Sequence, residues 1–84
     1  MAVKRIKTYT VVSCGNQQNY KPFIFSTNEE AVKKMNELCR EYLSHAEEDS
    51  DIYKFISDDR AIVAVDGRYI RIDIYKTEFD LEIN

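Results

Sequence analysis

The sequence has little of several residue types that mark whole classes of protein. Its 84 residues include two glycines, one proline and no tryptophan, which excludes a collagen-like chain, a proline-rich linker and a low-complexity disordered tail. No stretch reaches the roughly 18 consecutive apolar residues that a membrane helix needs. Basic residues are not in excess: 12 lysines and arginines against 15 acidic residues give a net charge of −3. That balance argues against a histone-like coat of nucleic acid.

What remains is the composition of a folded soluble protein, 44% hydrophobic and 32% charged. Chains of this length bury one core, so we predict a single domain over residues 1–84. The first residues are positively charged without an apolar segment behind them, so no signal peptide is expected.

Metal ligands and nucleophiles are also scarce. Cys14 and Cys39 lie far apart in the chain and His45 is the only histidine, whereas a zinc site needs about four ligands, usually in closely spaced pairs. Small secreted scaffolds carry more cysteines than this. We therefore predict free thiols, no metal, no cofactor and a cytoplasmic location.

The sequence shows no set of residues arranged for catalysis. Cys39 lies in the apolar stripe of a predicted helix, where a thiol usually fills space, and nothing in the pattern brings Cys14 to His45. The acidic segments 47–51 and 58–59 lack the glycine of a calcium loop, and the two isolated glycines form no phosphate-binding loop. The sequence therefore predicts a protein that is not an enzyme.

The clearest predicted element is a helix from about Asn28 to about Ala46. Overlapping capping boxes begin at Ser26 and Thr27, each with a glutamate three residues later. Apolar residues then recur at steps of three and four, as on one side of a helix. They are Ala31, Val32, Met35, Leu38, Cys39, Tyr42, Leu43 and Ala46.

Strands are predicted on both sides of this helix. Residues 3–14 and 20–26 form a hairpin across the polar turn 15–19, and Pro22 restricts its second strand to a short or edge position. Residues 52–56 form a short strand after the helix.

The strongest strand signal is Asp66-Gly67 between two alternating runs, which predicts a two-residue type I′ hairpin over residues 60–75. The implied pairs are Val65 with Arg68, Val63 with Ile70, Ala61 with Ile72 and Arg60 with Asp73. One face is apolar and suits the helix. The other carries Ile62, Ala64, Tyr69, Arg71, Asp73 and Tyr75.

The C-terminal segment changes parity. Its apolar residues are odd-numbered (Phe79, Leu81, Ile83), while those of the preceding run are even-numbered (Ile70, Ile72, Ile74). A continuous strand sends odd and even residues to opposite faces. We therefore predict a bulge or bend at residues 76–78, with residues 78–84 as a last strand or a strand that waits for a partner.

These elements predict an α+β fold in two layers. One amphipathic helix packs on one face of a four- to five-stranded antiparallel sheet, in the order β-β-α-β-β-β or close to it. A single helix cannot cover both sides of such a sheet. The second face is therefore solvated or covered by something else.

An uncovered face and an apolar tail favour a small non-catalytic protein that binds another protein or a second copy of itself, with no membrane involved. Inhibition of a larger basic partner through the acidic runs is a further variant. The tail can equally complete the domain's own sheet. The predicted contact residues are Ile62, Tyr69, Arg71, Tyr75, Phe79, Leu81 and Ile83.

Single-stranded nucleic acid is the alternative partner. Tyr69, Arg71 and Tyr75 alternate along one strand face, and sheets with exposed aromatic residues beside arginine stack bases. The acidic net charge counts against this alternative.

Overall fold

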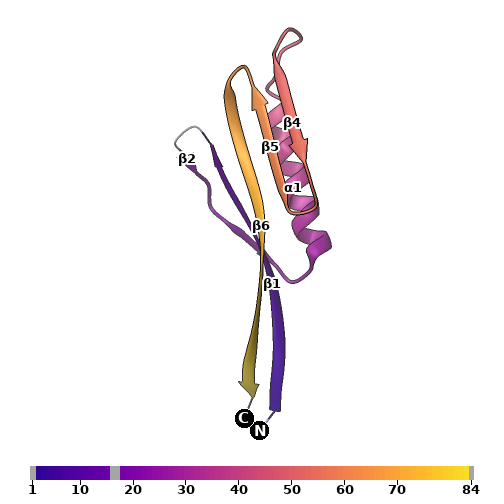
Figure 1. The fold of residues 1–84 in the computed structure, drawn as a ribbon, viewed down its shortest axis with the longest axis vertical. Helices are drawn as coiled ribbons and strands as arrows, with labels where there is room; N and C mark the ends of the chain where they lie inside the picture. The colour runs from indigo at the N-terminus through magenta and orange to yellow at the C-terminus, as the bar shows by residue number, and fades with distance from the viewer. Residues whose placement is uncertain (1, 16–17, 84) are drawn as a thin grey trace.

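The computed structural model describes residues 2–15 and 18–83. Within them, one helix lies on one side of an antiparallel sheet (Figure 1). The elements are β1 (Ala2–Gly15), β2 (Gln18–Asn19), β3 (Phe23–Phe25), α1 (Asn28–Leu43), β4 (Ile52–Ile56), β5 (Arg60–Val65) and β6 (Arg68–Ile83). The predicted α+β fold is confirmed. The predicted strand 20–26 is shorter than expected: only β3 is a strand, and it begins after Pro22, which cannot donate a ladder hydrogen bond. The short strand β2 lies within the predicted turn 15–19.

The sheet is organised around the long pair of strands β1 and β6. The described strands have the order β2-β1-β6-β5-β4, and β3 pairs with the same edge of β1 as β2 does. Strands β1 and β6 are paired without interruption from the Ala2–Ile83 rung to the Cys14–Arg71 rung. This pair joins the two hairpins of the chain into one sheet.

The hairpin between β5 and β6 has the predicted register. Every predicted pair is confirmed, from the rung beside the turn to the one that joins Arg60 and Asp73. Asp66 and Gly67 have φ values of 52° and 82°, the positive values that a type I′ turn requires. The local Asp-Gly signal therefore determined this part of the sheet.

Helix α1 begins where the capping pattern predicts. The Thr27 hydroxyl oxygen accepts the Glu30 backbone N–H at 3.3 Å and donates to the Glu30 carboxylate at 2.9 Å, so the second of the two capping boxes is the one used. The helix ends at Leu43, three residues earlier than expected. Ser44 follows, and its hydroxyl donates to a carbonyl of the last turn at 2.6 Å, as serine commonly does where a helix stops.

The core fills the space between α1 and the sheet. Its buried residues are Val11, Ala31, Met35, Cys39, Ala61, Val63, Ile70 and Ile72. The helix contacts β1, β3, β5 and β6 but not β4, all of whose residues are exposed. The sheet is therefore covered on one side only, and incompletely there.

Beyond β3 and β5, strands β1 and β6 continue alone as a two-stranded arm, which we define as residues 2–8 and 77–83. The arm gives the molecule its length of 61 Å against widths of 23 and 15 Å, and both chain ends lie at its tip (Figure 1). The predicted bulge at residues 76–78 is wrong. Strand β6 runs through them, and its register with β1 does not change.

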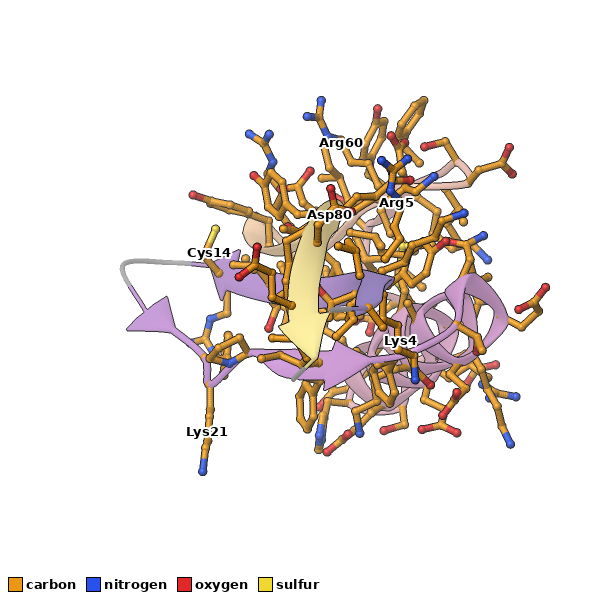
Figure 2. All side chains as sticks on the ribbon, turned by 90° about the horizontal axis from the view of Figure 1, so that it is seen from below. Lys4, Arg5, Cys14, Lys21, Arg60 and Asp80 are labelled. Atoms are coloured by element: carbon orange, nitrogen blue, oxygen red, sulfur yellow. The ribbon has the colours of Figure 1, made fainter. Side chains whose placement is uncertain are left out.

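The arm accommodates the change of parity by turning over. Strand β1 lies to the left of β6 beside the core and to its right near the termini (Figure 1). Figure 2 shows Arg5 and Asp80 pointing to the same side as Arg60, whereas Lys4 points to the side of α1. Leu81 pairs with Lys4 and shares its side. Two-stranded ribbons twist more than wide sheets, so the apolar residues of the tail return to the helix side without a bulge.

Candidate functional site

The side of the sheet away from α1 is an exposed aromatic surface, here called the open face. Register places Tyr53 and Phe55 of β4 beside Ile62 of β5, and Tyr69 and Tyr75 of β6 on the same side. The four aromatic side chains are 59%, 46%, 45% and 55% exposed, in the order named. No element among residues 2–15 and 18–83 covers them. Rigid aromatic side chains on a sheet are well suited to contact a partner.

Two arginines on the open face are fixed by one carboxylate. Asp73 accepts from Nε of Arg60 at 2.7 Å through one oxygen and from Nε of Arg71 at 2.9 Å through the other. The Asp73 side chain is only 13% exposed, while both arginines are about half exposed. The hydrogen bond to Asp73 raises the pKa of Arg60. The guanidinium groups are thus held in place among the tyrosines with donors left for a partner.

The arm has one charged side and one apolar side. Its charged side carries the Arg5–Asp80 pair at 3.2 Å and Glu78, which pairs at 3.0 Å with Lys76 just before the arm. The hydrogen bond from Lys76 lowers the pKa of Glu78, and the nearby basic residues of β1 add to the effect. The side toward α1 carries Phe79 and Leu81, which are about half exposed.

The residues predicted as partner contacts therefore form two surfaces rather than one. Ile62, Tyr69, Arg71 and Tyr75 come together on the open face as predicted. Phe79 and Leu81 lie on the arm, turned to the other side of the molecule. For Ile83 only the backbone pairing with Ala2 is described.

Sequence reasoning missed Tyr53 and Phe55. The strand Ile52–Ile56 was predicted, but its partner was not, so the side to which its odd residues point was unknown. The turn Ser57-Asp58-Asp59 held the missing signal, because a tight turn of this kind predicts pairing between β4 and β5. Ser57 donates its N–H to the Arg60 carbonyl at 2.8 Å and closes that turn.

The two thiols are free, as predicted, and lie on opposite sides of the sheet. Cys14 is half-buried on the open face beside Arg71. Cys39 is on the buried face of α1, and burial raises the pKa of its thiol, which makes it a poor nucleophile. Among the described residues, no three His, Cys, Asp or Glu side chains are placed to hold a metal ion.

Helix α1, the one helix in the described part of the chain, is not long and apolar enough to cross a membrane. The chain matches no protein-family model, no curated protein and no solved structure.

Proposed function

We propose that this protein is a non-catalytic protein-binding module and that the open face is its main contact surface. One observation carries the proposal: the sheet has its helix on one side, and its other side displays four half-exposed aromatic side chains around Ile62. Interfaces between proteins are enriched in tyrosine, phenylalanine and arginine and depleted in lysine and glutamate. The open face has this composition, although the chain as a whole is acidic.

The arrangement of the open face also resembles the energetic pattern of known interfaces. Binding energy concentrates in a few aromatic and arginine side chains near the centre of a contact. Tyr69 and Arg71 lie on the central strand β6, with Tyr75 further along it and Phe55 toward one edge. Because Asp73 already orients Arg71, a partner that binds there loses less side-chain entropy.

A single-stranded nucleic acid is the second candidate partner, favoured by the arginines among the tyrosines. Bases stack on exposed aromatic rings, and arginine contacts phosphate or stacks on bases. The net charge of −3 weakens long-range attraction to a polyanion, so we rank this partner second. Arg71→Gln is expected to weaken binding of short oligonucleotides at low salt. Arg5→Gln, which removes an ion-paired arginine from the arm, is the control.

The test of protein binding uses two neighbouring residues of β4. Phe55 points to the open face and Ile56 to the helix side, and the two are similarly exposed, at 46% and 51%. The tagged chain is used to capture partners from a lysate treated with nuclease. Phe55→Ser is expected to lower recovery of a specific partner by about tenfold, and Ile56→Ser to leave it unchanged.

Other results of the capture experiment would favour a different contact surface or a different partner. Equal recovery with both variants contradicts the open face as the contact surface. Recovery that disappears with nuclease favours the nucleic-acid candidate. If the chain binds only itself, light scattering shows a concentration-dependent dimer, and Phe55→Ser weakens it. Inhibition of a basic partner through the acidic runs predicts capture that falls steeply with salt.

We also propose that the protein works in the cytoplasm. Two free cysteines on opposite sides of the sheet are typical of a reducing compartment.

A further inference from the structure

A pocket lies on the other side of the sheet, between the second half of α1 and the start of β6. Its volume is about 460 Å³, within the range of about 300–1,000 Å³ found for small-molecule sites. Leu38 and Tyr42 of α1 line one wall and Ile70 of β6 lines the floor. Tyr20, between β2 and β3, and Phe23 of β3 line the opposite wall. None of these residues belongs to the open face, so the pocket is separate from the surface of the proposed function.

The pocket exists because β1 presents a small side chain to α1 near its end. The residues of β1 that face α1 are Tyr9, Val11, Ser13 and Gly15 in order along the strand. Ser13, which lines the pocket, is too small to fill the layer under the helix. Gly15 lies against the backbone of Tyr69, so closely that a Cβ at this position would overlap the Tyr69 carbonyl. The hollow is thus a consequence of the sequence.

The hydroxyl of Ser13 favours a binding site over a mere packing defect. Only 3% of Ser13 is exposed, and it is the only buried polar residue in the described part of the chain. Its carbonyl accepts the Tyr20 N–H at 3.1 Å, but its hydroxyl has no partner among the described residues. No sealed side-chain polar atom there lacks a hydrogen bond, so this hydroxyl is open to the pocket that it lines. A polar atom of a bound molecule can therefore hydrogen-bond to this hydroxyl in place of solvent.

The walls suit a flat apolar molecule. The Lys34 ammonium lies over the Phe23 ring, 4.3 Å from the ring centre, and helps to hold the ring in place. Tyr42 faces it from α1. Besides Ser13 and the hydroxyls of Tyr20 and Tyr42, the polar lining residues are Lys21, Glu41 and His45. A site with mostly apolar walls and few polar groups selects a ligand by shape and by one or two hydrogen bonds.

We infer that this pocket binds a small aromatic molecule of one or two rings, with a hydroxyl or carbonyl group that hydrogen-bonds to Ser13. The rings lie between the Phe23 wall and the helix. The inference goes beyond the proposed function, since it uses neither the open face nor the arm, and either can fail without the other.

The test is an NMR titration of the full chain with 2-naphthol. The amide signals of Ser13, Leu38, Tyr42 and Ile70 are expected to shift together with one dissociation constant below about 1 mM, which corresponds to a modest binding free energy. Shifts confined to the open face, or none at about 1 mM probe, would overturn the inference.

Two variants of β1 test the role of the hydroxyl. Ser13→Ala is expected to weaken 2-naphthol binding by about threefold to tenfold, the value of one hydrogen bond. The same change leaves the thermal midpoint unchanged or raises it, because the hydroxyl has no protein partner to lose. Thr10→Ala, on the opposite face of the same strand, is the control and leaves binding unchanged. A Ser13→Ala protein that melts earlier and binds the probe normally would make Ser13 structural and refute its role in the pocket.

Discussion

Deletion of residues 78–84 is expected to leave the domain folded. The deleted segment pairs only with residues 2–7 of β1 and contributes no buried residue among those described. Phe79 and Leu81 are 45% and 47% exposed. Burying about half of each side chain therefore returns about 1–1.5 kcal/mol apiece. Ordering the backbone costs about 1–2 kcal/mol per residue, a loss that the ladder's hydrogen bonds offset. The free energy of unfolding should thus fall by no more than about 2–3 kcal/mol.

Urea unfolding followed by circular dichroism measures this change against the full chain. The slope with urea is expected to fall slightly, because the shorter chain exposes less surface on unfolding. Val3→Ser and Leu81→Ser are point variants on the two sides of the arm: the first should leave stability nearly unchanged, and the second should cost no more than about 1–1.5 kcal/mol. A deletion that unfolds the domain, or lowers its stability by more than about 3 kcal/mol, a large share of what a domain of this size has, would refute this account. The arm would then belong to the core.

Three further changes test the core, the close approach of β1 to β6 and the arm. Met35→Ala removes a side chain with no exposed surface and should cost about 2–5 kcal/mol in urea unfolding; a cost near zero would mean that α1 is misplaced. Gly15→Ala places a methyl group against the Tyr69 carbonyl and should lower the thermal midpoint by about 10 °C or more; an unchanged midpoint would contradict that close approach. The pKa of Glu78 is lowered in the folded state by Lys76, so its contribution to stability is present above the unfolded pKa and lost as pH falls through the folded one. In Lys76→Met, an NMR pH titration should show the Glu78 pKa moving up toward its ordinary value, and no movement would contradict the pairing.

The parts of the fold that could be predicted rest on local chemistry. Asp66-Gly67 requires a particular turn, and that turn determines the register of every rung up to Arg60–Asp73. Thr27 and Glu30 satisfy each other within one helical turn. In each case the interacting groups are close in sequence, so the pattern contains both partners.

The partner of the C-terminal segment could not be predicted in the same way. Residues 77–83 pair with residues 2–8, the segment farthest from them in sequence, and no turn joins the two. The pocket was missed for a related reason. Ser13 was interpreted as part of the end of a strand, because only the position of α1 over the sheet shows that a small residue there leaves a hollow.

The predicted bulge at residues 76–78 was wrong because the alternation of odd and even residues says nothing about the twist of the strands. Counting alternate residues assumes a flat strand, whereas a free two-stranded ribbon turns about its own axis. A change of parity along a strand can therefore mark a bulge or a ribbon that turns over, and the two differ in which backbone amides point to the partner strand.

Amide exchange distinguishes these alternatives directly. Ile74 donates its N–H to the Asp59 carbonyl at 2.8 Å, away from β1. Successive N–H groups alternate in direction, so in a continuous β6 those of Phe79 and Leu81 point to β1, while those of Glu78 and Asp80 point to the open edge. Exchange measured by NMR should thus be slower at the odd residues of the arm than at the even ones. A bulge at residues 76–78 would reverse that order, with slow exchange at the even residues. Equally fast exchange at both would mean that the arm is not paired in solution, and the surface formed by its apolar side would not exist.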